Sequence, residues 1–183
     1  MVKEIIIVAR EEKYECISDM CKKYGFDKVE KIMKGGESRT GSVINGVFAA
    51  STKSRFIAIH DGARPCADAQ LVNRTITAAV KYNAAAPATK ITSTVKKVTA
   101  SVISETVERD DLYEIQTPQV FRAEIIKAAL TNVMKKSIPV TDDCKAVELL
   151  GVPIYVVEGS RRNIKITDAA DLHRVESLIL GGA

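Results

Sequence analysis

The feature that most constrains the fold is the alternation of short apolar segments with longer amphipathic ones. Residues 4–9 and 56–60 are apolar runs that are rich in β-branched residues and too short for helices. Residues 68–82 carry apolar side chains at helical spacing, and residues 167–168 form a polar cap before a last amphipathic segment. This alternation predicts an α/β fold, with a Rossmann-like, mostly parallel sheet flanked by helices.

A different pattern occupies residues 93–107. Polar and apolar residues alternate there, many are β-branched, and residues 99–101 suit a turn. We expect a β-hairpin, within a projecting arm at about residues 90–110 of a single domain spanning 1–183. An isolated two-stranded hairpin is marginally stable in water, so it either leans on a second subunit or folds back on its own domain.

Composition excludes several classes of protein. With 46% hydrophobic and 27% charged residues, the chain has the balance of a soluble globular domain. A net charge of +4 without a basic run argues against nucleic acid as a partner. No signal peptide or membrane-length apolar run is evident, and the four cysteines lack C-x-x-C spacing. These features predict a reduced, cytoplasmic protein without a zinc site or membrane partner.

One strand runs directly into candidate functional residues. The segment 56–60 is followed by Asp61, then by Gly62 and Arg64. Ligands of open α/β sheets bind at the carboxyl ends of strands, where a carboxylate can hold a divalent metal and an arginine can hold a phosphate. The alternative is an ordinary Asp-Gly turn that ends the strand. The local pattern does not choose between the two.

Four segments, in one order, carry a family resemblance. They are Gly-Gly-Glu-Ser-Arg-Thr-Gly-Ser-Val (35–43), His-Asp-Gly-Ala-Arg-Pro (60–65), Gln-Thr-Pro-Gln-Val-Phe (116–121) and Asn-Ile-Lys-Ile-Thr (163–167). With Thr-Asp-Asp at 141–143, this order resembles the 2-C-methyl-D-erythritol 4-phosphate cytidylyltransferases over about residues 4–180. The ribitol-5-phosphate cytidylyltransferases share much of the pattern, including residues 141–145, so the acceptor stays open.

The resemblance implies a reaction and a set of catalytic residues. The phosphate of methylerythritol phosphate attacks the α-phosphorus of CTP and releases pyrophosphate, in the non-mevalonate pathway to isoprenoids. Asp61 matches the acid associated with Mg²⁺, or another divalent cation, and with the α-phosphate. Lys165 and Thr117 match groups near the phosphate of the sugar substrate. Lys165 could instead be a solvated strand residue, and Thr117 a turn hydroxyl.

The same resemblance implies contacts with the nucleotide and between subunits. Gly36 and Ser42 match positions that contact the cytidine, and Glu37 is a weaker candidate. Thr94 and Arg109, at the two ends of the expected hairpin, match residues delivered into the partner's site of a homodimer, a region to which Arg64 could contribute. Arg109 could also form an ordinary surface ion pair with the acids that follow it.

One part of the family pattern has no counterpart in this sequence. The family's chains open with a strand, a glycine-rich loop with an arginine and a Pro-Lys-Gln segment, whereas this sequence begins near the family's second strand. We therefore expect an interrupted or rearranged sheet, weak hydrogen-exchange protection at residues 4–9, and little transferase activity. A non-catalytic dimeric remnant or binding protein is the alternative of another class.

Overall fold

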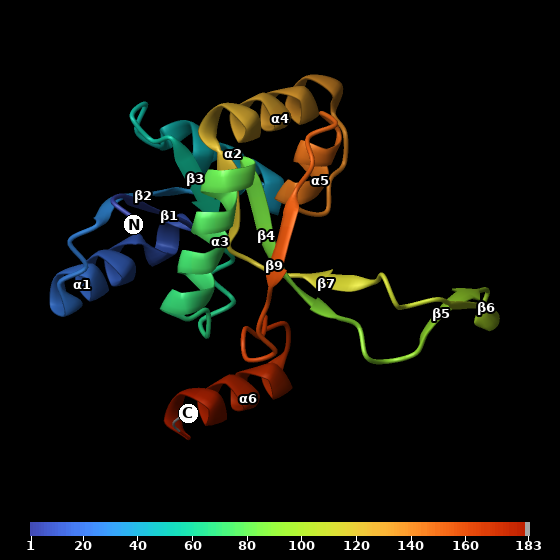
Figure 1. The fold of residues 1–183 in the computed structure, drawn as a ribbon. Coiled ribbons are helices and arrows are strands. Elements are labelled where there is room, and N and C mark those ends of the chain that lie inside the picture. The colour runs from blue at the N-terminus through green and yellow to red at the C-terminus, as the bar shows by residue number, and fades with distance from the viewer. Residues whose placement is uncertain (182–183) are drawn as a thin grey trace.

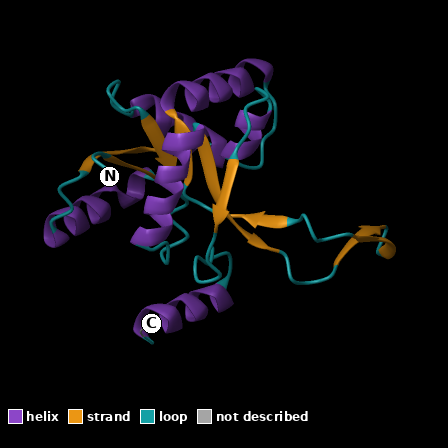
Figure 2. Ribbon diagram, viewed as in Figure 1, coloured by secondary structure: helices purple, strands orange, loops and turns teal. Residues whose placement is uncertain are grey.

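The strands group into three sheets. The computed structural model describes residues 1–181, and Figures 1 and 2 show the arrangement of its elements. A parallel two-stranded sheet contains β1 (Ile5–Ala9) and β2 (Val29–Lys34). A five-stranded sheet contains β3 (Phe56–Ile59), β4 (Ala84–Lys90), β7 (Tyr113–Ile115), β8 (Gln119–Arg122) and β9 (Tyr155–Glu158). The third sheet is the hairpin of β5 (Val95–Thr99) and β6 (Val102–Val107).

Four of the helices, α2, α3, α5 and α6, begin at a polar capping residue. Ser38, Asp68, Asp142 and Asp168 each accept a hydrogen bond from the backbone N–H three residues on, as N-caps do. The cap predicted at residues 167–168 is therefore confirmed. The helices are the 3₁₀ turn η1 (Glu11–Lys13), α1 (Tyr14–Tyr24), α2 (Arg39–Ala49), α3 (Ala69–Tyr82), α4 (Ala123–Lys136), α5 (Asp143–Glu148) and α6 (Ala169–Leu180).

The five-stranded sheet is mixed, so the prediction of a mostly parallel sheet was wrong. Strands β3, β4 and β9 run in one direction, while β8 lies antiparallel between β3 and β4, and β7 pairs antiparallel with β4. The sequence around β8 hides this strand, because polar Gln119 and Arg122 bracket only two apolar residues. Pairing with strands on both sides supplies what this short segment lacks in local β-propensity.

Helices cover both faces of this sheet, and small residues on β4 let them approach. Ala84 and Ala86 pack with Phe121 into a large apolar cluster that includes side chains from α2, α4 and α5. Ala85 faces the other way and packs with Ala79 of α3. This is the two-faced alternation expected of a buried strand. All of these side chains are almost fully buried.

Two pairs of strands, in the part of the chain that the structure describes, are not hydrogen-bonded to this sheet. Within residues 1–181, no ladder joins β1 and β2 to the five-stranded sheet, in which β3 is an edge strand. The hairpin β5–β6 extends far from the body in Figure 1 and exposes Val98, Val102 and Ile103. Ala100 and Ser101 adopt positive φ angles of 48° and 65°, which forms the turn expected at residues 99–101.

Among the described residues, no helix combines the length and apolar character needed to cross a bilayer.

Candidate active site

The register of two antiparallel strands builds the site. Ile59, at the end of β3, pairs with Gln119, at the start of β8. Continuing the two chains past this pair brings Asp61 opposite Thr117. The backbone N–H of Asp61 donates to Oγ1 of Thr117 at 3.1 Å. The two predicted residues, Asp61 and Thr117, therefore meet just beyond the paired ends of β3 and β8.

Four charged side chains form one network at this point. One carboxylate oxygen of Asp61, Oδ1, accepts hydrogen bonds from Nε and Nη2 of Arg39, each at 3.1 Å. Its other oxygen, Oδ2, lies 2.8 Å from Nζ of Lys165. Arg39 also reaches Oδ2 of Asp143 at 2.9 Å. Asp61 and Lys165, predicted from separate motifs, are thus in direct contact.

The two carboxylates of the network have opposite pKa shifts. Burial raises the pKa of Asp61, but the hydrogen bond from Lys165 and the positive charges of Arg39 and Lys165 outweigh it, so the pKa lies below its ordinary value. Burial also raises the pKa of Asp143, and there Arg39 does not compensate, so the pKa lies above its ordinary value. Asp61 is therefore the carboxylate that the network holds in its ionised form.

Sequence reasoning missed Arg39, Asp143 and the residue that aligns them, Gln119. Oε1 of Gln119 accepts from the backbone N–H groups of Asp143 and Cys144, at 3.2 and 3.0 Å. Its Nε2 donates to Asp142 at 2.9 Å, which fixes the first turn of α5. These residues lie within quoted motifs, but no local signal could show that positions 39 and 143 would form an ion pair.

The loop that carries Lys165 is tied to the loop after Asp61. The backbone N–H of Ile166 donates to the carbonyl of Ala63 at 2.8 Å, and Nη1 of Arg64 donates to the carbonyl of Asn163 at 2.7 Å. Lys165 lies in irregular chain rather than in a strand. Arg64 is buried, and this burial lowers its pKa. Its predicted role in a region shared between subunits stays a prediction.

The predicted cytidine contacts line a cavity beside this network. It has a volume of about 630 Å³ and is bounded by the ends of β1 and β2 and the start of α2, with Gly36, Glu37, Arg39 and Ser42 in its wall. The N–H of Gly36 donates to Oγ of Ser42 at 3.1 Å. A Cβ at Gly36 would lie only 2.6 Å from the carbonyl carbon of Gly41, so the loop requires glycine there.

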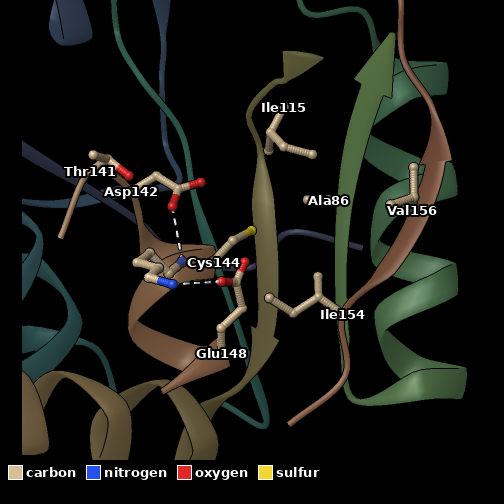
Figure 3. Close-up of a pocket in the computed structure, with 9 residues that line it drawn as sticks. Ala86, Ile115, Thr141, Asp142, Cys144, Glu148, Ile154 and Val156 are labelled. Carbon is tan, nitrogen blue, oxygen red and sulfur yellow. Dashed lines mark hydrogen bonds and ion pairs between the residues drawn. The ribbon is translucent and has the colours of Figure 1, made fainter. Parts of the chain in front are cut away.

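A second cavity, of about 480 Å³, lies under α5. Figure 3 shows Cys144 and Glu148 on one wall, facing Ile154, Val156 and other apolar side chains on the opposite wall. None of the predicted site residues lines it. Two residues that line the cavity, Asp142 and Cys144, are hydrogen-bonded to Gln119.

Thr94 and Arg109 lie at the base of the hairpin. The Arg109 side chain is exposed, and its Nη1 donates to the carbonyl of Thr92. Among the bonds within residues 1–181, none joins either residue to Asp61, Lys165 or Thr117. Within one chain the structure therefore does not bring these two predicted residues to the site, and delivery into a partner's site stays a prediction.

The donor set at Asp61 suits a cation that is shared with a polyphosphate. Mg²⁺ usually binds through one or two carboxylates and substrate phosphates rather than through an all-protein cage. Asp61 offers one ionised carboxylate, and residues 1–181 contain no cluster of three or more His, Cys, Asp or Glu side chains placed to hold a metal. The residues present therefore fit Mg²⁺ or another divalent cation that arrives with the nucleotide.

Comparison with known proteins identifies the family. Residues 1–181 match the model of the 2-C-methyl-D-erythritol 4-phosphate cytidylyltransferase (IspD) family. The chain belongs to this family. The cytidylyltransferase of Clostridium novyi is 37% identical over 96% of this chain and 76% of its own length, and that of Clostridium acetobutylicum is 38% identical over 98% and 79%.

Solved structures of the family share the fold. The 4-diphosphocytidyl-2C-methyl-D-erythritol synthase of Anaerococcus prevotii has a TM-score of 0.86 and 33% identity, over 96% of this chain and 78% of that one. The enzyme of Thermus thermophilus has a TM-score of 0.79 and 27% identity, over 95% and 80%. The predicted family and enzyme class are confirmed. These matches cover 95–98% of this chain and 76–80% of the relatives' own lengths, and they give no support to the expectation of lost activity.

Proposed function

We propose that this chain transfers the cytidylyl group of CTP to 2-C-methyl-D-erythritol 4-phosphate, giving CDP-methylerythritol and pyrophosphate. Family membership supports the reaction, and one observation carries the residue assignment. Asp61, held ionised between Lys165 at 2.8 Å and Arg39 at 3.1 Å, stands beside the cavity of Gly36 and Ser42. A polyphosphate, a cation and a second phosphate can meet only where such charges are gathered.

Each group has a defined task in this reaction. Gly36 and Ser42 bind the cytidine, and Asp61 presents its carboxylate toward the α-phosphate. Asp61 would hold a divalent cation, which would supply positive charge to the triphosphate. Lys165, whose side chain is 40% exposed, leaves Asp61 to bind the phosphate of the acceptor, whose oxygen attacks the α-phosphorus in line. Arg39 keeps Asp61 in place when Lys165 moves.

The hairpin supports a homodimer in this proposal. Val98, Val102 and Ile103 are more than half exposed in one chain, and burial against a partner would remove this apolar surface from water. Thr94 and Arg109, at the base of the arm, would then reach the partner's acceptor site. The single nucleotidyltransferase domain, the cytoplasmic location and the absence of nucleic-acid partners stay predictions from the sequence.

A pyrophosphate-release assay on the purified chain tests the function. We expect turnover with CTP and methylerythritol phosphate and slower turnover with ribitol 5-phosphate. Asp61→Asn should lower kcat by at least about 100-fold, because the carboxylate that holds the cation is lost. Asp19→Asn, on the exposed surface of α1, is the matched control. Wild-type turnover by Asp61→Asn, or a preference for ribitol phosphate, would contradict the proposal.

A further inference from the structure

Four hydrogen bonds close a ring behind Asp61. Nδ1 of His60 lies 3.0 Å from Oγ1 of Thr117, and the carbonyl of Thr117 accepts from Nδ2 of Asn163 at 2.9 Å. The carbonyl of Asn163 accepts from Nη1 of Arg64 at 2.7 Å, and the carbonyl of Arg64 lies 3.1 Å from Nε2 of His60. Arg64, Thr117 and Asn163 are buried, so water does not compete freely for the two bonds between them, whereas His60 is exposed.

The chemistry of the partners fixes the direction of each bond in this four-residue ring. The carbonyl oxygen of Arg64 can only accept, so Nε2 of His60 carries a hydrogen. In a neutral imidazole Nδ1 is then an acceptor, and the hydroxyl hydrogen of Thr117 points to it. Oγ1 of Thr117 meanwhile accepts from the N–H of Asp61 at 3.1 Å. The only hydrogen of this hydroxyl is therefore used inside the ring.

We infer that the four-residue ring sets the distance between the loop that carries Asp61 and the loop that carries Lys165. His60, Thr117 and Asn163 are then positioning residues for the reaction. Thr117 acts through the main chain of Asp61, not by donating to a substrate phosphate. Asp61 adjoins His60 in the chain, and Lys165 follows Asn163 by two residues, so two of the ring members lie next to a functional side chain. The inference rests on the proposed function for its catalytic meaning.

The ring matters because phosphoryl transfer depends on alignment. A misplacement of about 1 Å at the reacting groups can lower the rate on the order of 100-fold. The segments that carry Asp61 and Lys165 are more than a hundred residues apart in sequence, and the only bond that joins their main chains directly runs from Ile166 to Ala63, among the described residues. The ring adds hydrogen bonds from side chains between the same two segments, directly and through Thr117.

Nitrogen NMR on the full chain, with every nitrogen isotopically labelled, tests the bond directions. The chain has two histidines, and His173→Gln assigns their signals. At pH 7.5 we expect His60 in a single tautomer with hydrogen on Nε2. We expect Thr117→Val to shift its Nδ1 signal and the amide signal of Asp61. A hydrogen on Nδ1, a doubly protonated ring, or a tautomer average equal to that of His173 would overturn the inference.

Binding of Mn²⁺ with CTP, followed by electron paramagnetic resonance without any acceptor, tests the positioning role. We expect Thr117→Val to weaken binding about 10-fold and Thr117→Ser to restore it, because serine keeps the hydroxyl. Thr75→Val is the matched control, since Thr75 is buried and its hydroxyl bonds to the carbonyl of Leu71 in α3. Unchanged binding in Thr117→Val would overturn the role, because an acceptor phosphate is absent from the assay.

The two measurements separate this inference from the proposed function. If the wild-type chain failed to bind Mn²⁺ with CTP, the proposed function would fail. The histidine tautomer and the Asp61 amide signal would still decide whether the ring exists and holds Asp61. Should Thr117→Val fail to fold, Thr117→Ser and the wild-type spectrum carry the test. In Thr117→Ser we expect an unchanged tautomer of His60, and a changed one would contradict the ring.

Discussion

Two lysine–carboxylate pairs of almost equal length lie in very different surroundings. Lys165 and Asp61 are 2.8 Å apart at the site, and Lys97 and Glu105 are 2.7 Å apart on the hairpin. The Asp61 side chain is 15% exposed, whereas that of Glu105 is 55% exposed. Exposed pairs contribute about 0–1 kcal/mol to stability. The comparison teaches that the length of an ion pair says little about its contribution to stability unless its burial and its neighbours are known.

The supports of the two pairs differ as well. The Lys165–Asp61 pair joins two loops that are held by the four-residue ring, by Arg39 and by the buried sheet beneath. The Lys97–Glu105 pair joins two strands of one hairpin, whose only ladder within residues 1–181 is with each other. The site region therefore depends on long-range contacts, and the hairpin depends on local ones.

Hydrogen exchange should give the largest contrast. Amides of β4 should exchange only through global unfolding, whose free energy is on the order of 5–15 kcal/mol. Amides of β5 and β6 should exchange with little protection in a dilute sample. We expect β1 to be weakly protected compared with β3. Mass spectrometry of exchanged peptides measures this. Protection of the hairpin equal to that of β4 at high dilution would break the comparison, and protection that rises with concentration would support a dimer.

Truncation of apolar side chains should give the next largest contrast, in the free energy of unfolding. Phe121→Ala removes a fully buried ring from the main core and should lower the free energy of unfolding by about 3–5 kcal/mol. Val102→Ala, on the exposed hairpin, should change it by less than about 0.5 kcal/mol. Urea unfolding of both variants is the measurement. A large loss in Val102→Ala in dilute solution would show that the hairpin packs on its own chain.

Removing the two lysines compares the ion pairs directly. Lys165→Gln should lower kcat/KM for the acceptor phosphate about 100- to 1000-fold, which corresponds to about 2.7–4 kcal/mol. Lys97→Gln should leave stability within about 1 kcal/mol of the wild type. Steady-state kinetics with varied acceptor and urea unfolding test the two statements. Equal kinetic effects of the two substitutions would remove the distinction between the pairs.

The smallest effects concern pH and the two acids that share Arg39. The pKa of Asp61 is lowered from 3.8, so its ionised form stabilises the fold above that pH, and this stability is lost as the pH falls through the folded value. The pKa of Asp143 is raised, so its ionised form opposes folding at neutral pH, and protonation relieves this as the pH falls through the raised value.

Substitution of each acid should therefore change the acid dependence in opposite ways. Asp61→Asn should flatten the loss of unfolding free energy below pH 3.8, the ordinary value, and Asp143→Asn should steepen the loss above it. Urea unfolding from pH 3 to 7 measures both slopes, with Asp19→Asn as the control for removing an exposed charge. Parallel curves for the two variants would contradict the opposite pKa shifts.

Much of the element order could be predicted, because alternating periodicity is a local property. Residues 84–90 form a strand although it contains Pro87, and the carbonyl of Pro87 accepts from the N–H of Gln116 at 2.8 Å. β8 could not be predicted, because its evidence lies in its neighbours on both sides. The antiparallel direction of β8 could not be predicted for the same reason.

The candidate site shows the same limit. Asp61 could be predicted because it lies two residues after a strand, whereas Lys165 and Thr117 were found only through motif order. The pairing of Arg39 with Asp143 spans 104 positions, and no spacing rule covers such a distance. The bond directions around His60 also needed coordinates, since a histidine in a sequence does not reveal which of its nitrogens carries the hydrogen.

The four-residue ring has an unequal tolerance to genetic change. Three of its acceptors are main-chain oxygens, of Arg64, Thr117 and Asn163, and no codon can delete them. A replacement that offers a donor of similar reach could therefore restore the bond at position 64 or 163. The side chains at positions 60 and 117 both donate and accept a hydrogen bond, so substitution in this lineage should be most restricted at these two positions.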